Sequence, residues 1–367
     1  MRRRGEDLFD FSIGDPDEPT PEFIRRALLD AVTPTSSYPT SAGHPELRQA
    51  IAGWAERRHG VVVDPDNEVL PSAGSKEAIF HLPFVVIDPA GDKRSVAWGD
   101  PGYPVYERGT LFAGGRSEPV AMSADDGWLL DLGSLPQERL ERTAIAWVNY
   151  PHNPTGAVAD RDWFARQVEV ARRHDILLCS DECYQELWFD EPAPSVLEVC
   201  GDDRSGVLAF VSLSKRSGMT GYRAGAMIGD PDLIARLRRF RPNLGTAPQD
   251  FTQAAATAAW GDQQHVDERR EVFAAKRRVI LPFLEDAGLE VSGSAATFYV
   301  WFRAPGGDDP GYAEALLREK IVASPGRSFG TAGAGWMRLA LVPTAAECER
   351  AVERWGRAID AGRLPTG

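Results

Sequence analysis

The sequence of 367 residues predicts an α/β protein with a mostly parallel sheet covered by helices. Short apolar segments typical of buried strands alternate with amphipathic segments typical of helices. Gly, Pro, Asp or Asn residues bound these segments and mark the turns between them. Because a strand–helix–strand order favours parallel neighbours in a sheet, the alternation predicts parallel pairing.

The individual elements follow from apolar runs and their spacing. The predicted strands in the middle of the chain are Ser95–Trp98, Thr143–Val148, Ile176–Ser180 and Gly206–Ser212. Between the second and third of them, Asp162–His174 has apolar residues at helical spacing. Further helices are predicted at His44–Arg57, Lys76–Phe84, His265–Leu284 and Ala345–Ala361, and a β-segment at Thr297–Phe302. The long helix at 265–284 is expected to bridge two lobes.

Composition and charge narrow the class of protein. The formal net charge of −13 opposes broad contact with nucleic acid or anionic lipid. No segment approaches the roughly 20 apolar residues of a membrane helix, so we expect a cytoplasmic protein without an anchor. The four cysteines fit a reduced compartment and show no metal-ligand spacing; they are Cys179, Cys183, Cys200 and Cys348. Cys179 lies in an apolar run and is predicted to be a core residue.

The segment from Ser212 to Gly225 carries the main chemical signal. Lys215 follows a predicted buried strand, where an ammonium group is costly to bury. A lysine that works as an imine avoids that cost. The hydroxyls of Ser212 and Ser214 and the charge of Arg223 would bind a phosphate beside it. Alone, this segment also fits a solvated Lys-Arg pair in a loop.

Two other polar residues follow predicted strands. Asp181 ends the strand before Glu-Cys-Tyr184, and it would pair with a protonated pyridine nitrogen or cap a helix. Asn153 lies in the turn Tyr-Pro-His-Asn-Pro-Thr-Gly. Its amide would donate to a phenolic oxygen of a cofactor, as would the Tyr184 hydroxyl, although a plain β-turn also fits. His152 is given no catalytic role.

Two motifs in the first third of the chain complete the pattern. Tyr103 lies between prolines that restrain the backbone, so its ring can be held against a planar ligand. Gly74, Ser75 and Lys76 open a predicted helix, whose backbone N–H groups form an anion site. Neither the Walker A spacing nor a G-x-G-x-x-G fingerprint is present.

Together, these motifs resemble the class I/II aminotransferases of the fold-type-I pyridoxal-phosphate (PLP) enzymes. They occur in the family's order from Ile13-Gly14-Asp15-Pro16 to Met337-Arg338-Leu339. The resemblance implies a large domain with a mostly parallel seven-stranded sheet between helices and a smaller α/β C-terminal domain. The large PLP-binding domain would span residues 30–265, and residues 1–29 and 266–367 would form the small domain. Two departures are the short segment before Gly14 and the tyrosine at 222, where the family often has Trp.

The resemblance also implies a role for each site residue. Lys215 would bind PLP covalently and move the proton between substrate and cofactor. Asp181 would hold the pyridine nitrogen, and Tyr103 would stack on the ring and act with these two in catalysis. The remaining cofactor contacts would be Ser75, Lys76 (through its backbone), Asn153, Tyr184, Ser212 and Arg223, with Tyr38 contributed across a homodimer interface. The substrate carboxylate would be bound by Gly14, Asn153 and Arg338.

Within the family, several stretches look most like succinyldiaminopimelate aminotransferases. They are Tyr38–Trp54, Leu70–Pro83 and Ser212–Gly225. This likeness implies amino transfer from glutamate to N-succinyl-2-amino-6-oxopimelate in lysine and diaminopimelate biosynthesis. The alternatives are an aspartate, alanine or aromatic aminotransferase, or a same-fold C–S lyase or oxidase. A PLP-binding transcription regulator is disfavoured by the acidic charge. Arg327 is either a surface residue or a contact for a distal carboxylate.

Overall fold

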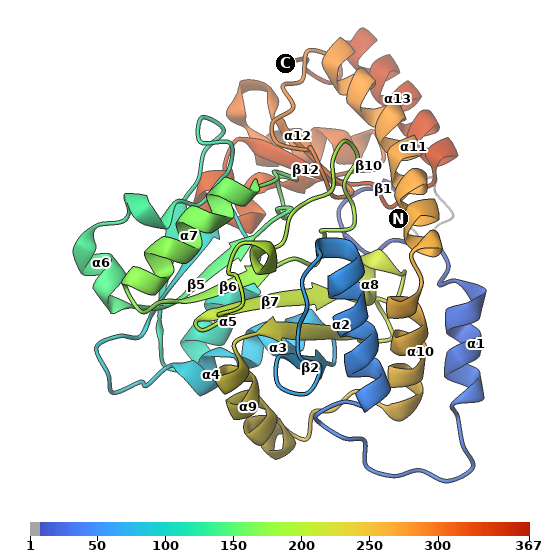
Figure 1. Cartoon of the computed structure of the whole chain (residues 1–367). Coiled ribbons are helices and arrows are strands. Elements are labelled where there is room, and N and C mark those ends of the chain that lie inside the picture. The colour runs from blue at the N-terminus through green and yellow to red at the C-terminus, as the bar shows by residue number, and fades with distance from the viewer. Residues whose placement is uncertain (1–7) are drawn as a thin grey trace.

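The computed structural model describes residues 8–367, and a seven-stranded sheet forms its centre (Figure 1). The strand order is β2-β8-β7-β6-β5-β3-β4. In that order, the strands are Val69–Ser72, Gly225–Gly229, Val207–Ser212, Leu177–Asp181, Thr143–Asn149, Ser95–Asp100 and Arg116–Ala121. In this sheet, β8 runs antiparallel to the other six strands, which are parallel to one another. The predicted α/β class and mostly parallel seven-stranded sheet are therefore confirmed.

Helices cover both faces of the sheet, because alternate side chains of each strand point to opposite sides. One apolar core joins the sheet to α2 (Pro45–His59), α7 (Arg161–Arg173) and α10 (Asp250–Gly261). The helix α1 (Glu22–Asp30) packs against α10. The other core contains residues of α3, α5 and α9, with α4 packed beside it. The bounds of these four helices are Ser75–His81 for α3, Pro83–Val86 for α4, Val105–Phe112 for α5 and Pro231–Phe240 for α9.

Two short helices frame individual strands of the sheet. The strand β5 follows α6 (Gln137–Arg142) directly. The strand β7 runs straight into α8 (Leu213–Arg216), a single turn that contains Lys215. Lys215 therefore lies in a short helix that directly follows a buried strand.

A second, smaller core surrounds an antiparallel sheet in the order β11-β12-β9. These strands are Ser324–Pro325, Trp336–Ala340 and Tyr299–Arg303. Around them lie α11 (Gln264–Asp286), α12 (Asp309–Arg318) and α13 (Ala345–Asp360). The N-terminal strand β1 (Phe9–Asp10) pairs with β10 (Ile321–Val322), so the two ends of the chain share this region. The domain boundaries at residues 29/30 and 265/266 stay a prediction, and residues 1–7 lie outside the described range.

Most predicted elements are confirmed to within a few residues, but one helix is wrong in its extent. The segment predicted as a helix over 76–84 is two helices, α3 and α4, with Leu82 between them. Pro83 begins the second helix, because its ring cannot donate to the preceding turn and clashes with it. The strands β2 and β8 were not predicted, since Pro71 and three glycine or alanine positions weaken their apolar pattern.

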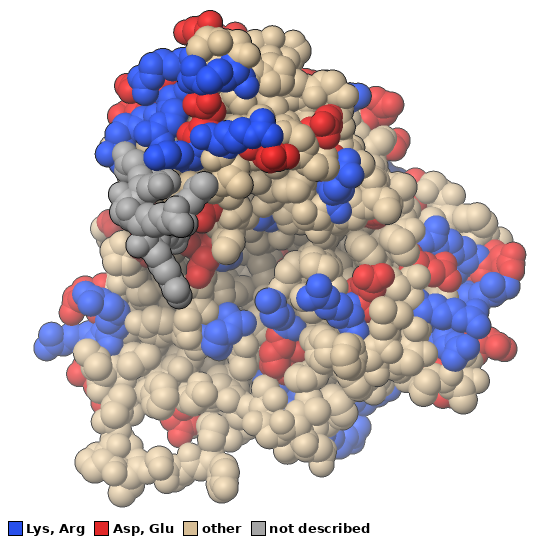
Figure 2. Space-filling model, turned by 180° about the vertical axis from the view of Figure 1, so that it is seen from behind, with Lys and Arg blue, Asp and Glu red and all other residues tan. Residues whose placement is uncertain are grey.

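Charges of both signs are mixed over the surface. Figure 2 shows one face, on which Lys and Arg gather at the upper end and are interspersed with Asp and Glu. That face therefore has no single-sign field of the kind that steers nucleic acid. Among residues 8–367, no helix combines the length and apolar character needed to cross a membrane.

A buried lysine joins the N-terminal segment to the small core. Lys276 on α11 is almost fully buried and donates to Glu18 and to the carbonyls of Leu341 and Val342. One cation therefore satisfies acceptors from two separate parts of the chain. The segment that enters the pocket near Gly14 is held by this contact.

We expect Lys276→Ala to lower the free energy of unfolding by about 2–4 kcal/mol, because it leaves a carboxylate and two carbonyls without their donor. Urea unfolding followed by circular dichroism measures this change. Arg278→Ala on the same helix is the control, since Arg278 and Glu271 are both mostly exposed. It should cost less than about 1 kcal/mol. Equal losses in the two variants would contradict the prediction.

Candidate active site

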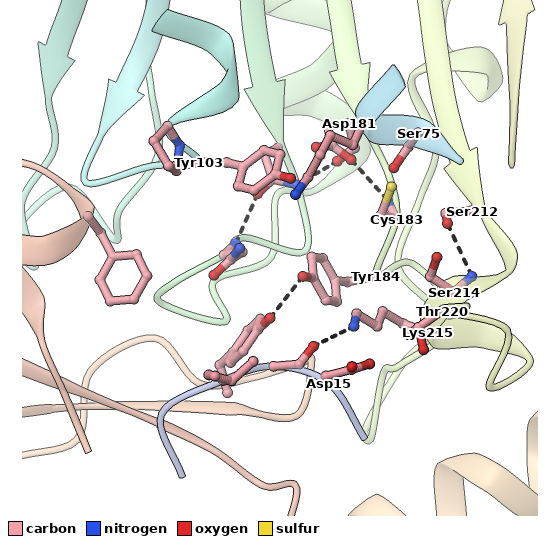
Figure 3. A pocket seen from close by; sticks show the side chains of 18 of the residues that line it. Asp15, Ser75, Tyr103, Asp181, Cys183, Tyr184, Ser212, Ser214, Lys215 and Thr220 are labelled. Carbon is pink, nitrogen blue, oxygen red and sulfur yellow. Dashed lines mark hydrogen bonds between the residues drawn. The ribbon is translucent and has the colours of Figure 1, made fainter. Parts of the chain in front are cut away.

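A cavity of about 630 Å³ opens at the carboxyl ends of β5, β6 and β7. The carboxyl edge of an α/β sheet is the usual position of a ligand site. The cavity is lined by all but one of the predicted site residues, namely Gly14, Ser75, Lys76, Tyr103, Asn153, Asp181, Tyr184, Ser212, Lys215, Arg223 and Arg338. Figure 3 shows several of these side chains pointing into the same space. The structure therefore brings together residues that are more than 300 positions apart in the chain.

Asp181 is buried at the end of β6 with only uncharged donors around it. The Tyr106 hydroxyl donates to its Oδ2 at 2.7 Å, and the Cys183 backbone N–H lies 3.3 Å from Oδ1. Burial raises the pKa of this carboxyl, although both hydrogen bonds act in the opposite direction. Within the described part of the chain, no cation lies within ion-pair distance of it. A positively charged ligand group at this position would meet an unneutralised carboxylate.

A chain of amide hydrogen bonds connects the strand ends to the small sheet. Asn149 ends β5 opposite Asp181 and donates to the Asp181 carbonyl at 2.7 Å. The Asn149 side-chain oxygen accepts from the Asn153 N–H at 3.0 Å. In turn, Asn153 Oδ1 accepts from Arg338 Nη1 at 3.0 Å. The position of Asn153 is thus set from both sides of the cavity.

Lys215 extends from α8 into the cavity. Its Nζ donates to the Gly14 carbonyl (Figure 3), and its own carbonyl accepts from Arg269 Nε at 2.9 Å. Burial lowers the pKa of the Lys215 amine from 10.5 to about 8, while the carboxylate of Asp15 opposes this shift. A lysine with this pKa has a substantial neutral fraction near pH 7–8, which a nucleophilic amine requires.

Hydroxyls and a guanidinium gather at another part of the cavity wall. Ser75 begins α3, and Ser212 ends β7. Arg223 has a left-handed backbone (φ 57°), and a side chain at Gly74 would collide with its guanidinium. Gly225 lets the start of α3 approach β8, because an added Cβ would lie 3.0 Å from the Ser75 nitrogen. These features create a compact site for an anion.

Arg338 lies between two aromatic rings on the opposite wall. Its guanidinium carbon is 4.4 Å from the Tyr299 ring centroid and 4.3 Å from that of Phe329. Nη2 donates to the Ser12 carbonyl at 2.7 Å, whereas the buried Nε has no partner among residues 8–367. This unsatisfied donor is available to an entering carboxylate.

One predicted site residue lies outside the cavity, and two residues to which the sequence assigned no definite role, Arg327 and His152, have structural contacts. Tyr38 is fully exposed between α1 and α2, outside the cavity. Arg327 is not in the cavity either: it bonds the buried carboxylate of Asp309, with Nη2 at 2.7 Å from Oδ1, which favours the surface alternative. Burial lowers the pKa of His152 to about 3, and its ring bonds Thr155 within the turn.

Sequence reasoning missed three residues of the site. Asn149 and Tyr106 touch the residues predicted to be functional, and Tyr299 contacts both Tyr184 and Arg338. The first had a usable signal, because it ends a predicted strand just as Asp181 does. The other two, Tyr106 and Tyr299, are aromatic residues, and their sequence context fits a core position as well as a site position. As predicted, Cys179 is a buried core residue.

The donors and acceptors of the cavity fit a particular kind of ligand. A buried carboxylate without a cation suits a protonated ring nitrogen, and the Ser75, Ser212 and Arg223 group suits a phosphate. The weakly basic Lys215 amine between them suits a carbonyl carbon. PLP has all three groups.

Comparison with known proteins decides the family. Residues 6–354 match the family model described as aminotransferase class I and II. The chain belongs to this family. Its members depend on PLP, so the chain is a PLP-dependent aminotransferase.

Individual relatives agree with this assignment over almost their full length. The LL-diaminopimelate aminotransferase of Desulforudis audaxviator is 41% identical over 96% of this chain and 91% of that protein. A solved aminotransferase from Neisseria meningitidis is 36% identical with a TM-score of 0.90, covering 94% of this chain and 91% of that one. A probable N-succinyldiaminopimelate aminotransferase from Thermus thermophilus is 30% identical, again with a TM-score of 0.90, over 97% and 96% of the two chains.

The depressed pKa of Lys215 predicts how its reactivity depends on pH. Without PLP, methylation of Lys215 by formaldehyde and borohydride should rise about tenfold per pH unit below pH 8 and level off above it. Peptide mass spectrometry measures the methylated fraction. In the urea-unfolded chain the rate should keep rising to about pH 10.4. A break above pH 10 in the native chain would refute this.

The same pKa has a consequence for stability. Between pH 8 and 10.5 the native chain binds fewer protons at Lys215 than the unfolded chain does. The contribution of this residue to the free energy of unfolding should therefore increase as the pH rises through that window.

Proposed function

We propose that this aminotransferase moves an amino group to or from LL-diaminopimelate, with glutamate and 2-oxoglutarate as the second substrate pair. Relatives that are 35–41% identical to this chain are LL-diaminopimelate aminotransferases. The N-succinylated acceptor predicted from the sequence is not supported by them. A structure named for that substrate shares 30% identity, less than any of these relatives.

The proposal assigns roles around the cofactor to residues that line the cavity. Lys215 is the residue that binds PLP covalently, and Asp181 is the partner of its ring nitrogen. Tyr103 covers the ring. The ring oxygen is contacted by Asn153 and Tyr184, and the phosphate by Ser75, Lys76 (backbone), Ser212 and Arg223.

The reaction then depends on where protons are held. When bound, PLP accepts the electron pair released as the Cα–H bond of the substrate breaks. Asp181 keeps the ring nitrogen protonated, because its buried carboxylate has no other cation to neutralise it. Lys215 would carry the proton of that Cα–H bond between the Cα atom of the substrate and the C4′ carbon of the cofactor. Its lowered pKa makes the neutral amine available for this transfer.

Two cations that line the cavity would suit a substrate with two carboxylates. Arg338 offers a buried, unpaired Nε to the α-carboxylate, and Gly14 and Asn153 lie beside it. Lys76 lines the same cavity, with its Nζ 5.8 Å from the centre of the Tyr103 ring. The structure gives the Lys76 ammonium no carboxylate partner among residues 8–367. We assign it to the distal carboxylate of diaminopimelate.

The proposed role of Tyr38 requires a second copy of the chain. Its side chain is fully exposed and accompanied by exposed Leu29 and Val32 on the same part of the chain. Exposed apolar side chains of this kind mark contact surfaces. We propose a cytoplasmic homodimer in which Tyr38 reaches the phosphate site of the partner subunit.

We expect LL-diaminopimelate to be the preferred amino donor for 2-oxoglutarate. Its kcat/KM should exceed those of N-succinyl-LL-diaminopimelate, aspartate, alanine and phenylalanine by about 100-fold or more, because among these donors only it carries an unmodified amino acid group at each end of the chain. Glutamate formation in a coupled assay measures each rate. A faster reaction with the succinylated donor would overturn the substrate assignment while leaving the aminotransferase assignment intact.

A substitution tests the distal contact in the same assay. Lys76→Met keeps the backbone and the length of the side chain but removes the charge. KM for LL-diaminopimelate should rise about 10- to 100-fold. KM for alanine, which has no distal carboxylate, is the control and should stay within about twofold. Equal changes for both donors would remove Lys76 from the substrate site.

We expect Asp181→Asn to lower kcat by about 100-fold or more, because an amide cannot hold a protonated ring nitrogen. Cofactor affinity, measured by equilibrium dialysis, should change less than about tenfold, since the phosphate and Lys215 contacts remain. Tyr106→Phe is the graded control: it removes one donor to Asp181 and should cost about 3- to 10-fold. Unchanged kcat in Asp181→Asn would exclude the proposed role.

A further inference from the structure

Tyr299 joins two groups of the site that have no direct contact with each other in the described structure. It begins β9, is buried, and places its hydroxyl 2.9 Å from the hydroxyl of Tyr184, a bond drawn in Figure 3. The two rings meet edge to face, with centroids 5.4 Å apart. Since both side chains are buried, this bond is shielded from water and its direction is fixed by what each hydroxyl contacts next.

The other surface of Tyr299 supports the substrate end. Its ring face carries the guanidinium of Arg338 at 4.4 Å, and Phe329 covers the opposite side of that guanidinium at 4.3 Å. A guanidinium held between two rings keeps its plane fixed, which a bidentate carboxylate contact requires. One aromatic side chain therefore touches the residues proposed for the cofactor ring oxygen and for the substrate carboxylate.

Tyr299 also explains why residue 14 is glycine. A Cβ on Gly14 would overlap the Tyr299 hydroxyl and would lie 3.0 Å from two carbons of its ring. The backbone of Gly14 is not among the positive-φ glycines, so its conformation does not demand glycine. The requirement comes from the space that Tyr299 occupies. Gly14 in turn offers its carbonyl to Lys215.

We propose that Tyr299 is a positioning residue that couples the cofactor end of the site to its carboxylate end. The inference rests on the roles proposed above for Tyr184 and Arg338. The Tyr299 hydroxyl donates to the Tyr184 oxygen, so that Tyr184 keeps its own proton for the ring oxygen of the cofactor. The Tyr299 ring meanwhile holds Arg338 flat and fixes the path of the chain at Gly14.

The direction of the hydrogen bond between Tyr299 and Tyr184 follows from the number of hydroxyl protons. Tyr184 has one proton, and its proposed contact with the ring oxygen uses it. Its oxygen must then accept from Tyr299, whose hydroxyl has no other hydrogen-bond partner among residues 8–367. When Tyr299 donates to Tyr184, it polarises the Tyr184 hydroxyl. The hydrogen bond that the Tyr184 hydroxyl donates to the cofactor is then stronger.

Tyr299→Phe tests the hydroxyl and leaves the ring in place. We expect the pH at which the absorbance of the Lys215-bound cofactor changes to rise by about 0.3–1 unit, because Tyr184 stabilises the ionised ring oxygen less well. We expect kcat to fall about 3- to 10-fold. KM for the amino donor should stay within about twofold, because Arg338 keeps its stacking.

A double variant distinguishes a positioning role of Tyr299 from a general loss of activity. In Tyr184→Phe, adding Tyr299→Phe should produce no further shift of the absorbance titration. Tyr312→Phe is the matched control, since Tyr312 is a buried tyrosine that bonds Trp355 far from the cavity. It should leave the titration unchanged. A full additional shift in the double variant, or an unshifted titration in Tyr299→Phe, would overturn the proposal.

The contact with Gly14 provides a test that needs no cofactor. Gly14→Ala should lower the melting temperature of the PLP-free protein, and Gly14→Ala combined with Tyr299→Phe should restore at least half of that loss. Additive losses would overturn the steric part of the inference. If borohydride fixes no cofactor onto Lys215 in the native chain, the proposed function fails, whereas this melting result still decides the role of Tyr299.

Discussion

The site depends on a carboxylate that the sheet buries without a cation. Asp181 lies at the end of an apolar strand, where uncharged donors of Tyr106 and Cys183 bind its oxygens. Folding accepts this arrangement because Asn149 and Tyr106 fix the surrounding backbone and side chain. In the proposed role of Asp181, this unneutralised charge would favour a protonated heterocycle.

The N-terminal segment closes the cavity and is fastened at several points. Ser12 accepts from Arg338, Gly14 accepts from Lys215, and Glu18 pairs with Lys276. Each of these contacts joins residues separated by about 200 positions or more. Site assembly is therefore a late consequence of folding, since loops of this length must close before the contacts form.

The sequence predicted the elements with strong local patterns and the residues that end them. Strands buried on both faces appear as continuous apolar runs, so β5, β6 and β7 and the polar residues after them were recognisable. The short strands β2 and β8 contain proline or glycine and lack such a run. Tyr299 could not be found in this way, because its function comes from contacts across the fold. The succinylated substrate was inferred from short stretches that related enzymes share, and such stretches do not encode the distal part of a substrate.

The left-handed backbone at Arg223 has a consequence for the life of the protein. A non-glycine residue in this conformation costs about 1–2 kcal/mol, and the cost is present whether or not an anion is bound. In the proposed role of Arg223, a bound phosphate would offset this cost only while the ligand stays. By mass action, the folded fraction then rises with the concentration of free PLP. The supply of vitamin B6 would thus govern how long each copy survives proteolysis, in addition to how fast it works.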